Sequence, residues 1–528
     1  MRLHEFLNLT AERFGNQLAL VHGDLKVSYD QVNKASSALA RTLSQYGFNP
    51  GSRVALMCDN GLQYVVGYFG ILQAGLVVVP IDTSLHPDKI RFIIDDCEAH
   101  ALITQGKYTR YLPRIVEGET TLTNILTDRS LPTLDIDINC DSMSEMLDAN
   151  FNEKDSHSPP DEDTTIAHFQ EIKRLAEKAS GDLAAIFYTS GSTGTPKGVM
   201  LSHRNLISNT VGTLEYLKIS SHDSVIVVLP FYYIYGNSLL LTHVAVGGRM
   251  VIDNRFTYPE TVLDTMEREK VTGFSGVPSN FMILLDKTTF PKRDFPHLRY
   301  FTQAGGAMAP EIVRQLIGAF PSKQIFIMYG QTEASPRVTW LPPDRLREKI
   351  GSAGIPVPGV EVIIVDDKGC ELPSGKTGEI VVGGDSVMMG YWNQTEEQAK
   401  VLREGKLYTG DLARKDEDGY IFIVGRKKEI IKTGGNRVSA KEIEECILEQ
   451  GQVSEVSVFG VEDPILGEAI RAVVVPKDGA NLDTKSIQDH CRGRLSTQKI
   501  PKYVTLVDSL PKYQSGKIDK PALKNLPL

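Results

Sequence analysis

The stretch Tyr188-Thr-Ser-Gly-Ser-Thr-Gly-Thr-Pro-Lys-Gly198 decides the fold class, because it follows the apolar run Leu183-Ala-Ala-Ile-Phe187 as a loop follows a buried strand. It carries five Ser/Thr hydroxyls, three glycines and one lysine. Such a loop can wrap a polyphosphate, since glycines let the backbone approach, N–H groups and hydroxyls donate, and lysine supplies charge. Its spacing differs from that of a Walker loop. We therefore predict a phosphate-binding loop of another type, with a plain flexible turn as the alternative.

Length and composition predict a globular protein of at least two domains. A chain of 528 residues is too long for one ordinary core, and 41% hydrophobic and 23% charged residues are ordinary values. No apolar run approaches the roughly 20 residues that span a bilayer, so no transmembrane segment is expected. Six scattered cysteines without a C-x-x-C pair indicate reduced thiols and a cytoplasmic location. A net charge of −9 argues against nucleic acid as a partner.

Short apolar runs alternate with helical patterns through the first part of the chain. Val54-Ala-Leu-Met57 and Val225-Ile-Val-Val-Leu-Pro230 are typical of buried strands, and residues 30–43 and 62–74 have helical periodicity. This alternation predicts an α/β fold with mostly parallel sheets. From about Gly354 the strands become closely spaced, which predicts a small β subdomain that completes the large N-terminal domain.

The domain organisation follows from these changes of pattern. We predict a large domain over residues 1–425 and a small α/β domain over residues 426–528, with a helix near 439–448 and strands near 456–459 and 471–475. Residues 141–180 are polar and contain Ser-Pro-Pro at 158–160. We interpret them as a surface excursion that ends in a helical stretch at 166–179.

Four further motifs follow the phosphate loop in order along the chain. They are Met328-Tyr-Gly-Gln-Thr-Glu333, Tyr408-Thr-Gly-Asp-Leu412, Gly425-Arg-Lys-Lys-Glu-Ile-Ile-Lys-Thr-Gly-Gly435 and Lys512-Tyr-Gln-Ser-Gly-Lys517. Together the five motifs resemble the signature of the adenylate-forming enzymes, which include acyl- and aryl-CoA synthetases, nonribosomal adenylation domains and beetle luciferases. With an opening segment near 27–55, the resemblance covers nearly the whole chain. It implies that a carboxylate is joined to the α-phosphate of ATP and that a small C-terminal domain swings on a hinge.

The resemblance assigns an ATP site and a metal ligand. Carboxylate and triphosphate repel, so such a site must neutralise charge and stabilise the departing pyrophosphate. Glu333 is expected to bind Mg²⁺, which prefers hard oxygen ligands. The implied ATP-binding residues are Thr189, Ser190, Gly191, Ser192, Thr193, Gly194, Lys197, Gly305, Gly306, Ala307, Tyr329, Gly330, Gln331, Thr332, Asp411 and Arg426.

Catalysis and thiol transfer are assigned to the small domain by the same resemblance. Lys517 is implied to enter the site during adenylation and to pair with the carboxylate and the α-phosphate, beside Thr332 and Glu333. Lys428 stands at the hinge position, where relatives often have Asp but also Lys. The implied path for a pantetheine arm is lined by Lys432, Gly434 and Gly435, although a solvated cationic face is the alternative interpretation.

The acyl pocket is expected around Leu229-Pro-Phe-Tyr-Tyr-Ile-Tyr-Gly236. α-Amino-acid-activating relatives usually have Asp where this chain has Tyr232, and no nearby acid replaces it, which argues against an α-amino acid substrate. Many relatives have a gating His where Tyr233 stands. The implied lining is Tyr232, Tyr233, Ala304, Gly305 and Val338. These residues leave fatty, aryl and polyketide-like acids open, and the tyrosines could instead be core aromatics.

Two acceptors remain open at this point. We expect an AMP-dependent ligase that uses ATP and Mg²⁺ to form an acyl-adenylate and then transfers the acyl group to the thiol of CoA. The alternative acceptor is the phosphopantetheine of a carrier protein. A luciferase-like oxidase and a catalytically dead scaffold are further alternatives, but a dead scaffold would have lost Lys517, Glu333 or Asp411, and all three are present.

Overall fold

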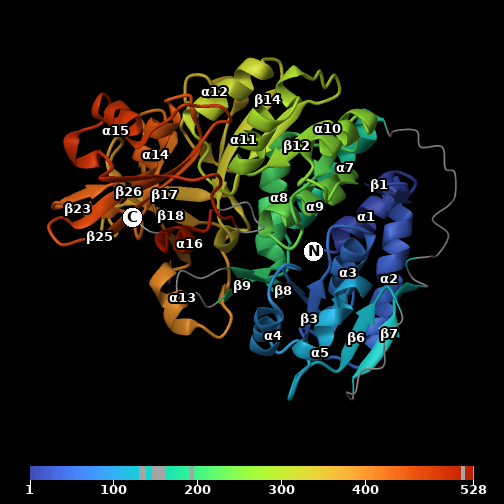
Figure 1. The fold of residues 1–528 in the computed structure, drawn as a ribbon. Coiled ribbons are helices and arrows are strands. Elements are labelled where there is room, and N and C mark those ends of the chain that lie inside the picture. The colour runs from blue at the N-terminus through green and yellow to red at the C-terminus, as the bar shows by residue number, and fades with distance from the viewer. Residues whose placement is uncertain (130–137, 145–146, 148–160, 190–195, 513–517, 527–528) are drawn as a thin grey trace.

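The computed structural model describes residues 1–129, 138–144, 147, 161–189, 196–512 and 518–526 (Figure 1). Two large sheets form the centre of the molecule. The first sheet has nine strands in the order β16 (Ile355–Pro356), β15 (Arg337–Leu341), β14 (Gln324–Gly330), β13 (Tyr300–Gln303), β12 (Gly273–Gly276), β10 (Ser224–Val227), β11 (Arg249–Ile252), β1 (Leu18–His22) and β2 (Leu25–Ser28). Its central strands run parallel, as the strand–helix alternation predicts.

The second large sheet carries the ends of the phosphate loop. Its order is β19 (Gly390–Tyr391), β9 (Lys197–Ser202), β8 (Leu183–Thr189), β4 (Val77–Pro80), β3 (Arg53–Met57), β5 (Ala101–Thr104), β6 (Asn124–Thr127) and β7 (Asn139–Ser142). β8 and β9 are antiparallel, with Thr189 opposite Lys197. The predicted loop therefore connects two neighbouring strands, and its residues 190–195 lie outside the described part of the chain.

Helices fill the space between the two sheets and cover their outer faces. The shared core holds Leu39, Val66, Leu206 and Leu240 from four inner helices, packed with residues of both sheets. The inner helices are α1 (Glu5–Phe14), α2 (Tyr29–Gln45), α3 (Leu62–Gln73), α8 (His203–Leu217) and α9 (Ile234–Val246). The outer faces are covered by α10 (Pro259–Arg268), α11 (Pro278–Lys287) and α12 (Pro310–Ala319) on the first sheet and by α4 (Pro87–Asp96) and α5 (Leu112–Ile115) on the second.

The start of α8 shows how the sequence positions the site locally. Ser202 ends β9, and its hydroxyl accepts a hydrogen bond from the backbone N–H of Asn205, whose side chain accepts from the N–H of Ser202. This reciprocal pair satisfies donors that an uncapped helix would leave free. The chain therefore turns sharply from the strand after the phosphate loop into a helix of the shared core.

A third sheet forms the predicted β subdomain. It contains β17 (Glu361–Val365), β18 (Thr377–Gly383), β21 (Lys406–Lys415), β20 (Leu402–Arg403) and β22 (Ile421–Arg426), and all of its pairings are antiparallel. The helix α13 (Thr395–Val401) precedes β20.

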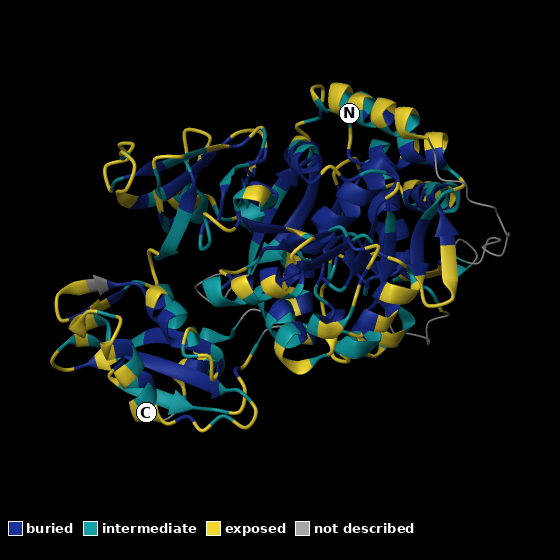
Figure 2. Ribbon diagram, turned by 90° about the horizontal axis from the view of Figure 1, so that it is seen from above, coloured by how far each residue is buried: buried dark blue, intermediate teal, exposed yellow. Residues whose placement is uncertain are grey.

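The C-terminal unit has its own small sheet and core, visible as a separate patch of buried residues in Figure 2. Its strands are β24 (Asn436–Val438), β23 (Ile431–Thr433), β26 (Gly467–Pro476), β25 (Val453–Asp463) and β27 (Tyr503–Leu506), and its helices are α14 (Ala440–Leu448), α15 (Thr484–Arg492) and α16 (Lys520–Lys524). The helix and strands predicted after residue 426 are confirmed. Residues 427–430 join this unit to the third sheet.

Part of the polar segment 141–180 is packed into the large unit. Its helix α7 (Glu162–Ala176) buries His168 and Ile172. The imidazole Nε2 of His168 lies 3.2 Å from the hydroxyl of Thr10 and 2.9 Å from the carbonyl oxygen of Ala245. The helix predicted from sequence is therefore present, and it is anchored by a buried imidazole.

Three buried histidines predict acid sensitivity. Burial lowers the pKa of His168, His203 and His243 to about 4, because the charged imidazole loses its hydration. The unfolded chain takes up these protons near pH 6.5, so the folded state binds fewer protons between pH 6.5 and 4. The free energy of unfolding should fall across this window as pH is lowered, by up to about 1.4 kcal/mol per pH unit per histidine. Equal urea midpoints at pH 7 and pH 5 would contradict this prediction, and His168→Gln should reduce the slope.

Candidate active site

Residues of the predicted ATP site gather at the carboxyl ends of β13 and β14. These two strands are parallel neighbours, so the segments that follow them leave the sheet at the same edge. Gly305, Gly306 and Ala307 follow β13, and Gln331 to Glu333 follow β14. Gly305 has φ +83°, a left-handed conformation that favours glycine, and a Cβ there would lie 3.0 Å from Val277 Cγ1.

Two side-chain amides at this edge have unsatisfied polar atoms. Gln303 donates through Nε2 to the carbonyl of Gly306 at 2.9 Å, but its Oε1 has no hydrogen-bond partner among the described residues. The Nε2 of Gln331 is also buried and has no partner in this part of the chain. Buried polar atoms of this kind carry a desolvation cost that a bound polar molecule removes. This edge of the sheet therefore offers buried hydrogen-bonding atoms to a polar ligand.

Asp411 connects the third sheet to the end of β14. Its carboxylate is 6% exposed and accepts a hydrogen bond from the hydroxyl of Tyr329 at 2.6 Å. Arg426, opposite Asp411 across β21 and β22, places Nε 3.2 Å from the other carboxylate oxygen. Burial and the neighbouring carboxylate raise the pKa of Tyr329 well above its ordinary value, so its hydroxyl remains a donor at neutral pH.

A second cluster links Glu333 to Lys197 through residues that the sequence analysis missed. The hydroxyl of Tyr391 donates to Glu333 Oε1 at 2.8 Å, and the ammonium of Lys197 lies 5.2 Å from the centre of the Tyr391 ring. Lys197 also pairs with Glu397 of α13 at 2.6 Å. Lys197 and Lys400 hold the pKa of Glu397 down to about 2, so Glu397 is charged at neutral pH. Tyr391 and Glu397 lie about 200 residues from Lys197 in sequence, and neither stands in a motif that would have indicated it.

The residues of the expected acyl pocket lie at the start of α9 and beside β13 and β15. The rings of Tyr232 and Tyr233 meet edge to face with centroids 4.9 Å apart. Ala304 follows β13 and Val338 lies in β15, and both are buried. An acid far away in sequence lies beside these tyrosines: Asp82 Oδ2 accepts from the Tyr233 hydroxyl at 2.7 Å. Its Oδ1 accepts from the N–H and hydroxyl of Ser84, so both oxygens are engaged.

The predicted thiol-path residues lie on a tight turn in the C-terminal unit. Thr433 and Asn436 pair across β23 and β24, and the two residues between them, Gly434 and Gly435, have φ +54° and +79°. Positive φ at both central positions defines the hairpin turns in which glycine is favoured. Lys432 is exposed on β23, and Lys428 lies in the segment that joins the third and fourth sheets. Lys517 lies outside the described residues, as do Ser190, Gly191, Ser192, Thr193 and Gly194.

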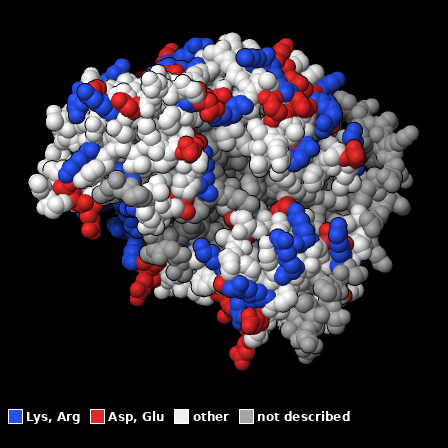
Figure 3. All heavy atoms as spheres, viewed as in Figure 1, with Lys and Arg blue, Asp and Glu red and all other residues white. Residues whose placement is uncertain are grey.

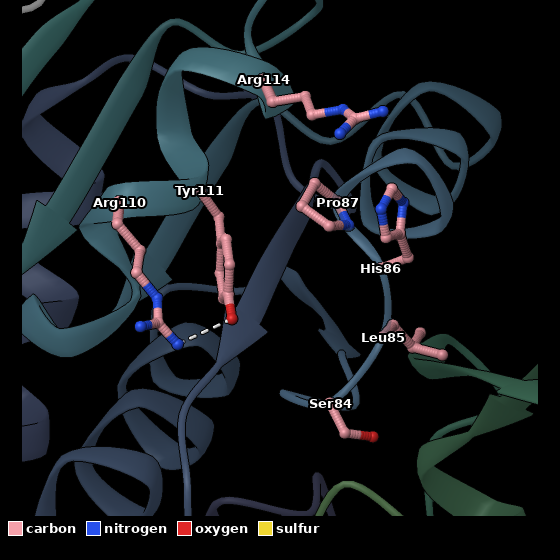
Figure 4. A pocket seen from close by; sticks show the side chains of 7 residues that line it. All are labelled: Ser84, Leu85, His86, Pro87, Arg110, Tyr111 and Arg114. Atoms are coloured by element: carbon pink, nitrogen blue, oxygen red, sulfur yellow. Dashed lines mark hydrogen bonds between the residues drawn. The ribbon is translucent and has the colours of Figure 1, made fainter.

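A pocket of about 450 Å³ opens elsewhere, at the surface beside α4 (Figure 4). It is lined by Ser84, Leu85, His86, Pro87, Arg110, Tyr111 and Arg114. Arg114 pairs with Asp88 at 2.8 Å, and Arg110 donates to the hydroxyl of Tyr111 at 2.9 Å. Of the predicted site residues that the structure describes, none lines this pocket.

Lys, Arg, Asp and Glu side chains are interspersed over the face drawn in Figure 3. Within the described ranges, no group of three or more His, Cys, Asp and Glu could hold a metal ion. Mg²⁺ is commonly held by one or two carboxylates together with substrate phosphates, which Glu333 fits. No helix in the described part of the chain is both long and apolar enough to cross a membrane.

Comparison with known proteins agrees with this geometry. A model of the AMP-binding enzyme family matches residues 7–392, and a model of the AMP-binding enzyme C-terminal domain matches residues 442–517. A long-chain-fatty-acid–CoA ligase from Yersinia pestis is 33% identical over 543 aligned positions, covering 99% of this chain and 94% of the relative. A feruloyl-CoA synthase from Amycolatopsis sp is 32% identical over 505 positions, covering 95% and 94%.

A solved structure shares the same fold over almost its whole length. The o-succinylbenzoate coenzyme A synthetase of Bacillus subtilis, in complex with ATP and magnesium ion, superposes with a TM-score of 0.80 at 25% identity, covering 98% of this chain and 99% of that one. The fold and site thus define an ATP-dependent acid–thiol ligase. The chain belongs to the AMP-binding enzyme family, as an acyl-CoA synthetase-like ligase.

Proposed function

We propose that the protein activates a fatty or aryl carboxylic acid with ATP and Mg²⁺ and transfers the acyl group to CoA. The observation that carries this proposal is the meeting of Asp411, Tyr329 and Glu333 at the carboxyl end of β14, with Lys197 linked to them through Tyr391. The acid classes come from the relatives, which include a fatty-acid ligase and a feruloyl-CoA synthase.

Each cluster would serve one requirement of adenylation. A substrate carboxylate oxygen attacks the α-phosphorus of ATP, and the bond to the leaving pyrophosphate breaks. Lys197 would neutralise the β- and γ-phosphates together with the loop that precedes it, and Glu333 would hold Mg²⁺, which would offset the negative charge of the phosphates. Asp411 would accept from the ribose hydroxyls, while Gly305 to Ala307 and Tyr329 would enclose the adenine.

The second step would use the C-terminal unit. The CoA sulfur attacks the acyl carbonyl carbon, the bond to AMP breaks, and the thiol proton passes to solvent. We propose a domain boundary at or just after 425/426, because β22 ends at Arg426 and the short connection at 427–430 follows, with a separate core on either side. Lys428 would act as the hinge, and Lys432, Gly434 and Gly435 would line the pantetheine path after rotation.

Identification of the thioester product tests the acceptor. The protein, ATP, Mg²⁺ and mixed fatty and aryl acids would be incubated with CoA or with a phosphopantetheinylated carrier protein, and products identified by mass spectrometry. We expect acyl-CoA and AMP to form together. Acyl-carrier formation without acyl-CoA would overturn the choice of CoA and favour the carrier protein as partner.

The hydroxyl of Tyr391 should affect the Mg²⁺ concentration that the enzyme needs, through its hydrogen bond to Glu333. Tyr391→Phe removes the 2.8 Å hydrogen bond to Glu333 but keeps the ring beside Lys197. A hydrogen bond to a charged group contributes about 1.5–3 kcal/mol, so the Mg²⁺ concentration for half-maximal activity should shift by at least about tenfold. Tyr46→Phe is the matched control, because the Tyr46 hydroxyl also donates to a carboxylate, Asp141, at the far edge of the second sheet. An unchanged Mg²⁺ dependence in Tyr391→Phe would remove this role.

A side chain at Gly435 should separate the two half-reactions. Gly435→Leu should leave adenylation intact and lower thioester synthesis at least about tenfold, because bulk would fill a narrow pantetheine path. Gly479→Leu is the matched control, since both glycines are exposed with φ near +80° and neither position has a heavy atom of the described residues within 4 Å of an added Cβ. Equal thioester rates for the two variants would exclude Gly435 from the path.

A further inference from the structure

Arg337 is a buried cation at the start of β15 that none of the proposed steps uses. It is only 2% exposed and ranks among the largest fully buried side chains. It lies opposite Gly330, at a register shift between β14 and β15. Such β-bulges turn a side chain away from the regular alternation of a strand. The side chain therefore reaches from the end of β15 into the shared core between the two large sheets.

The guanidinium of Arg337 is only partly satisfied. Its Nη1 donates to the hydroxyl of Tyr216 at 3.0 Å and lies 3.6 Å from the sulfur of Met328. Its Cζ lies 5.5 Å from the centre of the Tyr235 ring. The Nε and Nη2 donors are buried without a hydrogen-bond partner, and no ion pair to this guanidinium is found among the described residues.

Asp223 is the acidic residue near Arg337, and its charge is already neutralised by other residues. Asp223 and Arg337 both act on the pKa of the buried Tyr300, in opposite directions. The Asp223 carboxylate, however, pairs with Arg299 at 3.1 Å and accepts from the hydroxyl of Thr272 at 2.8 Å. An unpaired buried charge costs several kcal/mol, far more than a cation–π contact returns. An anion that enters from outside would supply the missing partner.

Arg337 and the residues that it contacts are neighbours, in sequence or in space, of the residues inferred to line the acyl pocket. Val338, the next residue, and Tyr233, two residues before Tyr235, belong to the lining inferred for that pocket. The hydroxyl of Tyr235 lies 2.9 Å from the hydroxyl of Thr302, two residues before Ala304, another lining residue. Tyr235 therefore joins the guanidinium of Arg337 to the β13 side of the pocket.

We propose that Arg337 is a specificity-determining residue that binds a second carboxylate at the far end of the substrate, so that the preferred acid is a dicarboxylate. This inference rests on the proposed function, in which the first carboxylate is activated by ATP. A guanidinium edge offers two parallel donors to one carboxylate, and Nε and Nη2 form such an edge. A monoacid of the same length leaves both donors unpaired and is rejected.

Paired substrates test the proposal directly. ATP–pyrophosphate exchange would be measured with monocarboxylic and α,ω-dicarboxylic acids of equal length, over a series of chain lengths. We expect kcat/KM for one diacid to exceed that of its matched monoacid at least about a hundredfold, since sites built around buried polar groups discriminate strongly. Higher kcat/KM for the monoacid at every length would overturn the dicarboxylate assignment while leaving adenylation established. The absence of exchange with every acid tested would overturn the proposed function itself.

Two variants assign the preference to Arg337. Arg337→Met keeps the length and removes the charge, so the diacid preference should disappear through a loss of diacid activity while monoacid activity is kept or rises. Arg337→Lys should retain part of the preference, because the charge stays but the two-donor edge is lost. Equal losses on both acids in Arg337→Met would make the residue structural and overturn the proposal. Should Arg337→Met fail to fold, the unfolding temperature of the unaltered protein decides: the diacid should raise it and the matched monoacid should not.

Discussion

Replacing Lys517 by alanine should lower the rate of adenylate formation by about a thousandfold. The attacking carboxylate and the α-phosphate are both negative, and a single preorganised charge at such a transition state contributes about a hundredfold to a thousandfold. The same variant should convert preformed acyl-adenylate and CoA to thioester at nearly the normal rate, because this lysine is proposed to leave the site when the C-terminal unit rotates. The two rates would be measured separately, by pyrophosphate release and by thioester formation.

The control for Lys517 is Lys524, a lysine close to it in sequence for which no role is proposed. Lys524 is exposed at the end of α16, so Lys524→Ala should change neither half-reaction. Equal loss of both half-reactions in Lys517→Ala would contradict the two-orientation account. Normal adenylation in that variant would remove Lys517 from the chemistry altogether.

Replacing Asp411 by asparagine should raise KM for ATP by about a hundredfold. The Asp411 carboxylate accepts from Tyr329 and pairs with Arg426, so the substitution removes the charge that organises both groups. It also weakens the acceptors proposed for the ribose hydroxyls, and hydrogen bonds to charged groups contribute about 1.5–3 kcal/mol each. ATP titrations at saturating acid would measure the change.

Asp416 offers a matched control for Asp411. It follows β21 in the same sheet and is also ion-paired, with Lys349 at 2.9 Å, but it stands outside the candidate site. Asp416→Asn should leave KM for ATP unchanged. If the two variants changed KM equally, the effect of Asp411 would be structural, and the ribose assignment would be wrong.

The fold was largely predictable because its signals are local. In the sequence, buried parallel strands are short apolar runs. The helices α3 (Leu62–Gln73) and α14 (Ala440–Leu448) have clear helical periodicity and lie close to the residues expected. The glycines at 434–435 fall on a turn that requires positive φ. The motifs after β13 and β14 likewise follow the carboxyl ends of these strands, which is where parallel sheets bind ligands.

The remaining contacts join segments that no local pattern connects. Asp82 meets Tyr233 across 151 residues, and Lys197 meets Glu397 across 200. Arg337 belongs to none of the sequence motifs and only precedes Val338, a predicted pocket residue. Its importance lies in the absence of a buried counter-charge among the described residues. Such facts depend on three-dimensional packing, so periodicity and spacing could not supply them.

Carboxylate-dependent ATP–pyrophosphate exchange is the most direct test of the central claim. The full chain would be assayed with Mg²⁺ and a panel of fatty, aryl, dicarboxylic and amino acids. The account predicts exchange that requires both Mg²⁺ and one class of non-amino acid, and that is lost in Lys517→Ala. Exchange that proceeds without added acid, or no exchange across the panel, would contradict acid adenylation by this protein.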